Sequence, residues 1–319
     1  MANLSQTSTN RPLTNVSLSY GNDTTDFIAP FISPAVPVIL ESADIYSYGT
    51  DNLRITNSIR SKGGKSTGVD WAVSKASHYQ LEDHAIHTYL TRKDYENVEK
   101  PIEAQRDATE MLTESLMVAK EFSLASSMQD TSVMTNNVTL TGTDQWSDYT
   151  NSDPISDITT GLEAIYDATG KAANTLIIPR DTLMVLLYHP KIKDLFPGAN
   201  QITAGMLKDG IGKIFPDITS VQVGMAQYNS ANKGADLSLT RIWTKTLIVA
   251  FVEKKPKLKS RSLSYTYQYK TARKVDFLGM NSGDKDLLDR KSDFIRVEDQ
   301  YDQVLVDVNC GYLIKNAIS

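Results

Sequence analysis

Cysteine is nearly absent from this sequence, which holds one, Cys310, among 319 residues. A single thiol cannot form a disulfide within the chain, and it cannot build a cysteine-based zinc site. Because Cys310 lies in a strand-like run, we interpret it as a small buried apolar residue. The length is nevertheless sufficient for an ample core, in one large domain or in two intertwined domains.

Long hydrophobic runs are absent as well. The longest purely apolar stretch, residues 247–252, has six residues, whereas a membrane-spanning helix needs about 20. The first residues show no basic patch followed by an apolar segment, which is the pattern of a signal peptide. We therefore expect a cytosolic product without a membrane partner.

Positive charge is in deficit, because 33 basic residues face 38 acidic ones, a net charge of −5. This balance argues against a surface that grips nucleic acid, although it allows a protein that encloses it. Residues 253–274 carry eight bases against one acid, and residues 284–302 carry seven acids against four bases. These segments form either two solvated faces or complementary rims that meet on neighbouring copies, since opposite charges steer docking.

Familiar catalytic motifs are missing too. The sequence has no Gly-x-Ser-x-Gly and no His-Glu-x-x-His. The run Gly63–Ser66 resembles the end of a phosphate loop, but Ile59 stands where that motif requires a glycine. Acid pairs such as Glu82-Asp83 and Glu298-Asp299 are neighbours on predicted strands, so their side chains point apart. We therefore predict no catalytic residue and no cofactor.

The histidines do not form a metal site in this reading. His84 and His87 point to opposite faces of a predicted strand, and His78 and His189 have no partner at ligand spacing. Structural or surface roles are expected for all four, and no bound metal is expected.

What the sequence does contain is extended apolar structure near its start. Residues 1–25 are polar and lack periodicity, which predicts a flexible arm. Residues 27–40 are apolar but are interrupted by three prolines, so we predict an extended segment that is neither helix nor central strand. Such a segment must lie on its own core or on a neighbour.

Residues 51–77 predict a long two-stranded ribbon. Apolar and polar residues alternate on both sides of a glycine-containing turn at Ser61–Ser66, which is the period of a half-buried strand. An isolated hairpin is marginal in water, so its apolar face must dock either on its own domain or on another copy. In the second case, the contacts with another subunit would come from Leu53, Ile55, Ile59, Lys62, Gly63, Gly64, Lys65, Val69, Trp71 and Val73.

A long helix follows the ribbon. Pro101 suits its first turn, and no breaker occurs before about Ser126. At about 1.5 Å per residue it makes a rod of roughly 40 Å, which is long for a helix in a compact domain. Its predicted packing stripe is Ala104, Ala108, Met111, Leu112, Ala119 and Phe122, and the predicted opposite side carries Glu103, Arg106, Glu110, Glu114 and Glu121.

An α/β-like region comes next, after a polar linker at residues 130–153. Asp153 and Pro154 start a predicted helix that Gly170 stops. A second helix follows a short buried strand, and more strands complete the region and the C-terminal tail. The predicted strands are 175–178, 220–225, 239–243, 247–252, 263–269 and 304–314.

The order of these parts resembles the Hong Kong 97-like fold of tailed-bacteriophage major capsid proteins, from about residue 27 onward. The segments that carry the resemblance best are Asn174–Leu183 with His189–Ile192, and Trp243–Val252. The resemblance implies an α+β fold with an α/β axial domain and a peripheral domain that contains a long spine helix and a β-sheet. The implied limits are 1–45 for the N-terminal arm, 46–78 for the extended β-hairpin loop, 79–153 and 253–319 for the peripheral domain, 97–128 for the spine helix and 154–252 for the axial domain.

The resemblance also implies a function. Such proteins self-assemble into pentamers and hexamers of an icosahedral head shell around double-stranded DNA, and the loop tip, Lys62–Ser66, would reach over a neighbouring subunit. The short arm before the loop implies either an uncleaved chain with a separate scaffolding protein or a chain supplied mature. A portal protein and, in some members, a decoration protein are further implied partners, and the virion is the implied location. Some members also form lysine–asparagine cross-links, for which Lys62, Lys65 and Lys75 lie in the right region.

Two alternatives stay open at this stage. An encapsulin-like nanocompartment shell has the same architecture but encloses protein cargo, and imaging of particles separates it from a DNA-filled head. A hydrolase or transferase on the α/β region is the alternative from another class. An enzyme would elute as a small oligomer, whereas a shell protein would elute as rings or very large particles.

Overall fold

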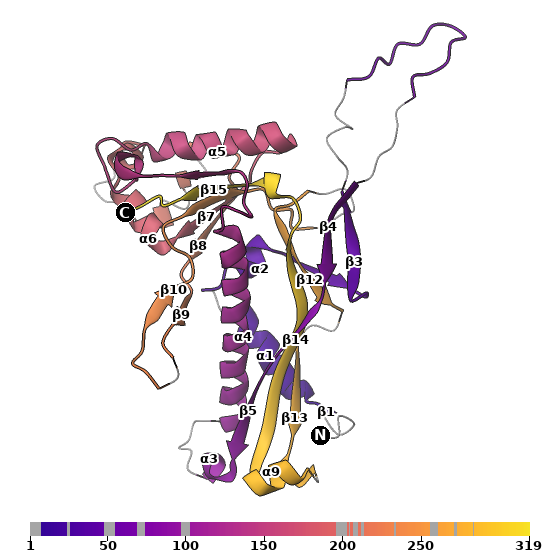
Figure 1. Cartoon of the computed structure of the whole chain (residues 1–319), viewed down its shortest axis with the longest axis vertical. Helices are drawn as coiled ribbons and strands as arrows, with labels where there is room; N and C mark the ends of the chain where they lie inside the picture. Colours follow the sequence, from indigo (N-terminus) through magenta and orange to yellow (C-terminus); the bar gives the residue numbers. More distant parts are fainter. Residues whose placement is uncertain are drawn as a thin grey trace.

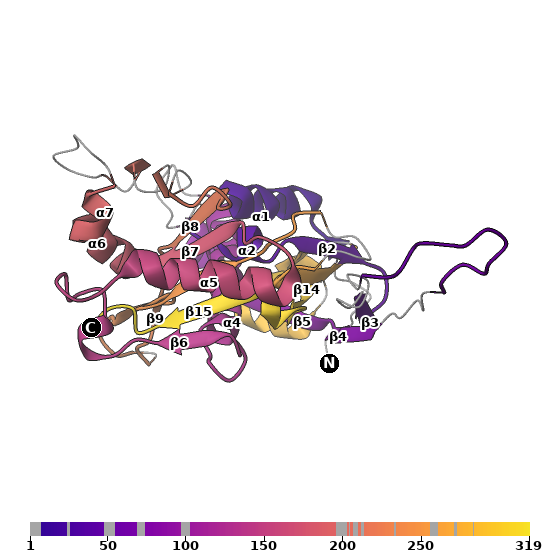
Figure 2. The same cartoon turned by 90° about the horizontal axis from the view of Figure 1, so that it is seen from above.

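The computed structural model describes residues 8–23, 26–47, 55–68, 74–96, 103–195, 203, 205–206, 210–211, 214–232, 234–255, 261–270, 273–282 and 284–319. The molecule is elongated, with a helix-covered sheet at one end, a second sheet beside a long helix, and a loop that projects far from both (Figure 1). Seen from above, the same loop extends from one side of the molecule (Figure 2). The α+β fold class predicted from the sequence is confirmed.

The long helix, α4 (Ala104–Met128), spans 25 residues, which corresponds to about 37 Å. Glu103 precedes it, and the backbone N–H of Gln129 closes its last turn on the carbonyl of Ala125. Residues 97–102, where the sequence placed the start of this helix, lie outside the described residues. The helix links the two sheets, because it packs on β14 and β5 of one and its C-terminal half contributes to the core beneath the other.

The larger sheet has the order β1-β13-β14-β12-β2, with β5 beside β14. Its centre is β14 (Ser292–Leu305), which pairs with β5 along one edge and with β13 and then β12 along the other. The remaining strands of this sheet are β1 (Ser8–Thr9), β2 (Ala35–Val38), β5 (Glu82–Thr91), β12 (Ser264–Tyr269) and β13 (Lys274–Leu278). No sequence pattern predicted β13, and of β14 only residues 304–305 fell within a predicted strand.

The second sheet has the order β6-β15-β11-β7-β8. Helices α5 (Pro154–Thr169) and α6 (Arg180–Tyr188) pack on one face around Leu176 and Ile178, whereas Ile177 faces the core that α2 and α4 share. The strands are β6 (Asn137–Thr139), β7 (Thr175–Pro179), β8 (Ser220–Gly224), β11 (Leu247–Ala250) and β15 (Gly311–Lys315). Because both faces are covered, β7 and β11 are apolar runs that are buried at every position.

The predicted limits of the α/β region need correction. Strands β6 and β15 belong to this sheet, although 154–252 was predicted as its whole extent and both strands were assigned to the peripheral part. Chain segments distant in sequence complete the sheet: β15 supplies the antiparallel neighbour of β11, and Trp146 is fully buried among the residues of the same core. The predicted domain limits followed the order of the sequence, so they missed that the C-terminal strand β15 returns to this sheet.

The N-terminal arm is also not a featureless segment. Residues Arg11–Asp23 form helix α1, which packs against α4 through a hydrogen bond of 2.7 Å between the buried hydroxyls of Ser17 and Thr113. One further helical turn, α2 (Ala29–Ile32), and the edge strand β2 follow. The prediction of an unstructured arm is wrong for residues 11–23, because Leu13 and Ser17, four residues apart, both face the interior.

The packing stripe predicted for α4 is correct at some positions and wrong at others. Ala108 and Leu112 are buried, but Met111 and Phe122 are 53% and 45% exposed and Ala119 is exposed as well. The helix instead buries a stripe that includes polar side chains: Ala108, Thr109, Leu112, Thr113, Leu116, Met117, Glu121, Leu124, Ala125 and Met128. The sequence carried two apolar stripes, and the sheet covers the one with the leucines.

Smaller elements complete the chain. A hairpin of β3 (Ser42–Ser47) and β4 (Ser74–Gln80) forms the base of the projecting loop, and a hairpin of β9 (Gln227–Asn229) and β10 (Leu239–Arg241) lies beside α4 (Figure 1). Further helices in the described ranges are α3 (Arg92–Glu96), α7 (Pro190–Lys193) and α9 (Lys285–Arg290), and short 3-10 turns occur at Gly142–Asp144, Met280–Ser282 and Val308–Cys310. Within the ranges given above, no helix is both long and apolar enough to cross a lipid bilayer.

Candidate interaction surfaces

The base of the projecting loop is a two-stranded hairpin held by an ionic cluster. In the β3–β4 register Asp44 lies opposite His78, and the Asp44 carboxylate accepts hydrogen bonds from Lys75 Nζ at 2.6 Å and from His78 Nδ1 at 2.7 Å. The hydrogen bond from Lys75, followed by that from His78, holds the pKa of Asp44 below its ordinary value. The backbone N–H of Gln80 donates to Asp302 Oδ2 at 2.9 Å, which ties the end of β4 to β14.

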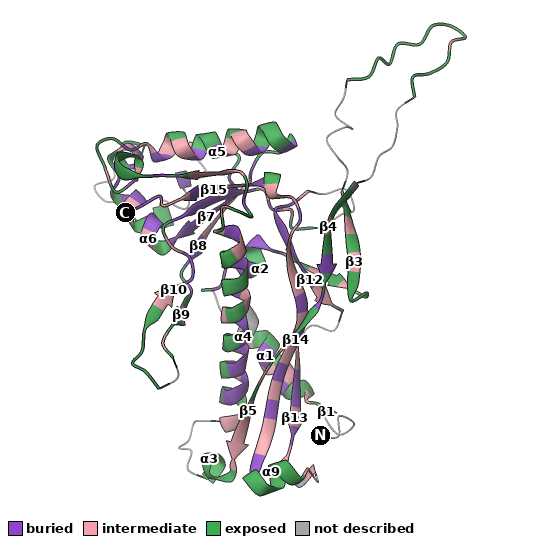
Figure 3. Ribbon diagram, viewed as in Figure 1, coloured by how far each residue is buried: buried purple, intermediate pink, exposed green. Residues whose placement is uncertain are grey.

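Beyond this base the described residues 55–68 lie in open solvent (Figure 3). The side chains of Ile55 and Ile59 are 103% and 87% exposed. The tip turns at Gly63, whose φ of 81° suits glycine, and the Gly64 N–H closes the turn on Ser61. Among the residues with a described position, none covers these isoleucines.

The predicted ribbon therefore differs from the structure in its pairing. Residues 55–68 form no strand ladder, and two cross-loop hydrogen bonds, from Arg60 Nε to the Gly64 carbonyl and from the Thr67 hydroxyl to the Asn57 carbonyl, hold the tip together. The alternating pattern was interpreted as paired strands, but regular pairing occurs at the base. Four of the predicted contact residues lie outside the described residues: Leu53, Val69, Trp71 and Val73.

The body of the molecule contains a buried junction that the sequence analysis missed. Glu121, predicted on the solvent side of α4, is fully buried. Its carboxylate accepts hydrogen bonds from Ala29 N at 2.7 Å, Ile28 N at 3.3 Å and Trp243 Nε1 at 2.5 Å. Burial raises the pKa of Glu121, and the three donors oppose that shift. One side chain thus joins the N-terminal segment, α4 and the strand-rich second sheet.

A second buried polar group lies between α1, α4 and the large sheet. Arg273 donates to the Ser17 carbonyl at 3.3 Å and pairs with Asp299 at 3.9 Å, and Gln268 donates to the same carboxylate at 2.6 Å. The ammonium of Lys120 lies 4.2 Å from the centre of the Tyr301 ring. Burial lowers the pKa of Lys120 and of Arg273. These contacts hold α1 onto the body of the subunit.

The histidines take the structural roles expected from the sequence. His84 stacks on Tyr301 with ring centres 4.2 Å apart, His87 packs on Phe294, and His78 pairs with Asp44. His189 is buried beside Ser152, 3.0 Å from its hydroxyl, and burial lowers its pKa. Among the residues with a described position, no three His, Cys, Asp or Glu side chains are grouped as metal ligands.

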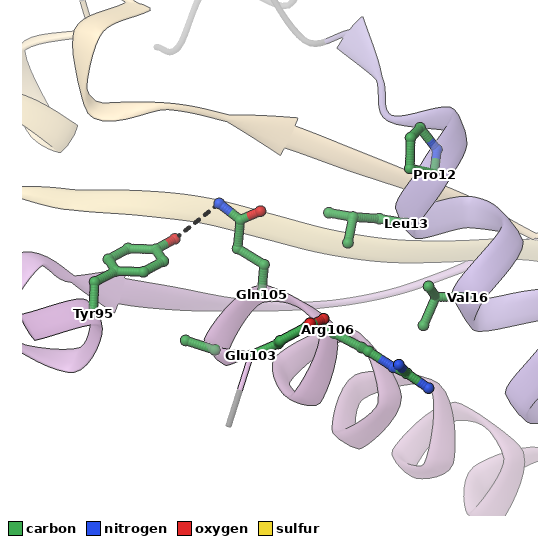
Figure 4. A pocket seen from close by; sticks show the side chains of 8 residues that line it. Pro12, Leu13, Val16, Tyr95, Glu103, Gln105 and Arg106 are labelled. Atoms are coloured by element: carbon green, nitrogen blue, oxygen red, sulfur yellow. Dashed lines mark hydrogen bonds between the residues drawn. The ribbon is translucent and has the colours of Figure 1, made fainter. Parts of the chain in front are cut away.

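A cavity of about 560 Å³ opens between the start of α1, α3 and the start of α4 (Figure 4). At its edge the Tyr95 hydroxyl donates to Asp293 at 2.8 Å and accepts from Gln105 at 3.2 Å. Burial raises the pKa of Tyr95 to about 12, so the phenol is neutral near neutral pH. The lining also includes Pro12, Leu13, Val16, Glu103, Ala104 and Arg106. This set offers no paired nucleophile and base.

Comparison with known sequences gives two curated relatives. The chain is 25% identical over 309 residues to the major capsid protein of Burkholderia phage BcepMu, covering 95% of this chain and 94% of that protein. It is 25% identical over 234 residues to the major capsid protein of Pseudomonas phage JBD67, covering 72% and 73%. No family model matches the chain.

Solved structures share the fold across almost the whole chain. A phage-related protein from Bordetella bronchiseptica superposes with a TM-score of 0.73 at 22% identity, covering 98% of both chains. The capsid of cyanophage P-SCSP1u gives 0.58 at 10% identity over 89% of this chain and 86% of that one. A virus-like particle from Pyrococcus furiosus gives 0.52 at 12% identity over 95% and 98%.

The two kinds of comparison agree with the geometry. Both curated relatives carry the same name, and one of them matches this chain from end to end. The solved neighbours from Bordetella bronchiseptica and Pyrococcus furiosus share the fold over 98% and 95% of this chain. The chain is therefore similar over nearly its whole length to a phage major capsid protein, and it shares its fold with solved phage capsid structures.

Proposed function

We propose that this protein builds the icosahedral head shell of a tailed bacteriophage, in which its copies associate head to tail into pentamers and hexamers around double-stranded DNA. Heterologous contacts of this kind need two different complementary surfaces on each copy, and they close into rings when the rotation allows it. The protein is a structural component in this proposal, with no catalytic step.

One observation carries the proposal. Residues 55–68 project from the subunit, and their two isoleucines are almost wholly exposed to solvent. Burying each isoleucine is worth about 1.5–3 kcal/mol, and the subunit gains none of this by itself. The loop therefore gains this burial energy only when its isoleucines lie on another copy. Residues Ile55, Ile59, Lys62, Gly63, Gly64 and Lys65 are therefore proposed as inter-subunit contacts.

The other partners follow from the role. A separate scaffolding protein, a portal protein and, in some heads, a decoration protein would meet this subunit in the assembled particle. Assembly would take place in the host cytoplasm before the shell becomes part of the virion. The net charge of −5 suits a container that encloses DNA without clamping it.

Negative-stain electron microscopy and size-exclusion chromatography of the purified protein test this function, with and without a co-expressed scaffolding protein. We expect rings or closed shells tens of nanometres wide. Particles filled with an enzyme and free of DNA in the producing cell would favour the nanocompartment function. A soluble monomer under every assembly condition would contradict both.

A further inference from the structure

Another cavity, of about 190 Å³, lies between the N-terminal segment, α4 and the large sheet. Leu18, Phe27 and Met117 form apolar walls, whereas Lys120 and Arg273 supply cations. The remaining lining residues are Ala29, Pro30, Ala35, Glu121, Gln268 and Asp299. A volume of roughly 10–15 Å³ admits one water, so this cavity has room for several waters or for one small tetrahedral anion.

Arg273 brings more hydrogen-bond donors to this cavity than its described neighbours accept. Its side chain lies just before β13, and Nη1 donates to the Ser17 carbonyl of α1 at 3.3 Å. The buried Nε–H has no acceptor within the described ranges. The nearest carboxylate oxygen, Asp299 Oδ2, is 3.9 Å from it, beyond the roughly 2.7–3.2 Å of a hydrogen bond. Since a buried donor without an acceptor is unfavourable, a ligand oxygen at this position would stabilise the folded subunit.

Lys120 is the second cation, and it also lacks a carboxylate of its own. Met117, three residues earlier on α4, is buried in the same cavity wall, which places Lys120 on that side of the helix. The Lys120 ammonium lies 4.2 Å from the centre of the Tyr301 ring and forms no ion pair with any residue of described position. Burial lowers the pKa of Lys120, Asp299 opposes this shift and Arg273 adds to it. An anion in the cavity would favour the charged ammonium.

The carboxylates of the lining do not neutralise both cations. The Glu121 carboxylate accepts three hydrogen bonds from backbone and indole N–H groups, and it is not among the charges that shift the pKa of Lys120. Asp299 is 4% exposed and accepts from Gln268 at 2.6 Å. One carboxylate therefore serves both Lys120 and Arg273, and in the described lining one positive charge is left without a counter-ion.

From these observations we infer that this cavity binds a small oxyanion, a phosphate or a carboxylate, between Arg273 Nε and Lys120 Nζ. The ligand oxygens accept from the two donors that the protein leaves unpaired. Leu18 is 38% exposed, so the cavity reaches solvent beside α1. Because α1 supplies both Leu18 and the Ser17 carbonyl, the site is complete only when α1 is docked, and the anion fastens α1 to the body. The inference goes beyond the proposed function, since it concerns a single subunit whether or not copies form a shell.

Hydrogen exchange of residues 11–23 measures this fastening, with inorganic phosphate as the probe and chloride at equal ionic strength as the reference. Phosphate at about ten times its dissociation constant should slow exchange about tenfold, because a ligand that binds only the docked state stabilises it by RT ln(1 + [L]/Kd). The slowing should saturate with phosphate, and chloride should not reproduce it. Acetate separates the two sources: slowing by acetate as well extends the site to carboxylates, and slowing by phosphate alone restricts it to tetrahedral oxyanions.

Substitutions at Lys120 assign the effect to the cavity. Lys120→Met removes the ammonium but keeps an unbranched apolar side chain, so phosphate should no longer slow exchange in residues 11–23. Lys120→Arg keeps a cation and should retain the phosphate response. Lys193→Met is the matched control, because Lys193 is an exposed lysine whose ammonium also lies on a tyrosine ring, 5.5 Å from the centre of Tyr188. That variant should respond to phosphate as the wild type does.

Three outcomes would overturn the site. Equal slowing by phosphate and chloride, or an unchanged phosphate response in Lys120→Met, would identify a general ion effect. No slowing by phosphate or acetate at any concentration would show that the cavity holds water only. The wild-type titration needs no substitution, so it decides the question even where Lys120→Met does not fold. Each of these results leaves the shell function standing, because none of them depends on particle formation.

Discussion

The body of the subunit and its projecting loop differ in which side chains they bury: the body buries polar groups, whereas the loop exposes apolar ones. In the body, polar side chains of α4 are buried and fully bonded, as in the contacts of Glu121 with Ala29, Ile28 and Trp243. In the loop, Ile55 and Ile59 are almost wholly exposed, and no residue in the described part of the subunit covers them. The body is therefore built to fold as one unit, whereas the loop carries exposed apolar residues that we propose lie on another copy.

This difference separates two classes of substitution. Changes in the body should lower the free energy of unfolding, because they leave cavities or unpaired buried groups. Changes in the loop should leave unfolding unaltered and should act on assembly alone. The predictions below test whether the separation holds.

Trp243→Ala should have the largest effect on stability. The Trp243 side chain is 1% exposed, and removal of a buried tryptophan costs about 3–5 kcal/mol. The change also takes away a hydrogen bond to the buried Glu121 carboxylate. Urea unfolding followed by circular dichroism measures the loss. Ile59→Ala in the loop is the control, and a cost for Trp243→Ala below about 1 kcal/mol would place the ring outside the core.

Glu121→Gln should have an intermediate effect. An amide keeps one acceptor oxygen, but its NH2 group would face an N–H donor, which costs about 1–3 kcal/mol. The hydrogen bond most readily lost is the one from the Ala29 N–H to Glu121 Oε2, which is 2.7 Å long in the wild-type protein. Since the N-terminal segment depends on this carboxylate, hydrogen exchange at Ile28 and Ala29 should accelerate in the variant while residues 55–68 stay unchanged.

The same variant gives a pH test. Burial raises the pKa of Glu121 in the folded protein, so the folded state holds the proton more tightly than the unfolded chain. The stabilisation from that proton is complete below the ordinary glutamate pKa and is lost as the pH rises through the raised value. The stability advantage of wild type over Glu121→Gln should therefore shrink as pH rises. An advantage that grows with pH would mean that the three donors outweigh burial.

Ile55→Ser with Ile59→Ser should have the smallest effect on stability, within about 0.5 kcal/mol, because both side chains are exposed in the subunit. Particle yield should nevertheless fall sharply, since the contact with the neighbouring copy loses its apolar part. Tyr166→Ser on α5, also an exposed large side chain at 55%, is the matched control and should leave assembly intact. A stability loss above about 1 kcal/mol would show that the loop supports its own body.

Sequence patterns correctly predicted the elements with a clear apolar pattern and clear start or stop signals. The period of α5, with its Asp153 cap and a stop at Gly170, matches the structure, and so do the buried strands β7 and β11. Strand β14 was missed because its less buried positions include Asp293, Arg296 and Glu298, and this charge-rich run was interpreted as either a solvated face or a rim for docking on a neighbouring copy. Its buried positions alternate with these charges, as in a half-buried strand.

The functional surfaces depend on contacts that no local pattern encodes. Glu121 is one of several glutamates on α4, and its donors lie about 90 residues earlier and 122 residues later in the chain. The apolar residues Met111 and Phe122 fit a core stripe by spacing alone, yet they face outward. The loop was recognisable as an element that needs a partner, because its alternation had to be satisfied somewhere. The sequence alone does not name the surface that covers the loop.

The most direct measurement replaces residues 55–68 by a short Gly-Ser linker and compares the variant with wild type by unfolding and by electron microscopy. The account predicts an unfolding midpoint equal to that of wild type, together with loss of closed shells. Shells of normal size and yield without the loop would contradict the claim that each subunit lends it to another, and a collapse of folding would contradict the independence of body and loop.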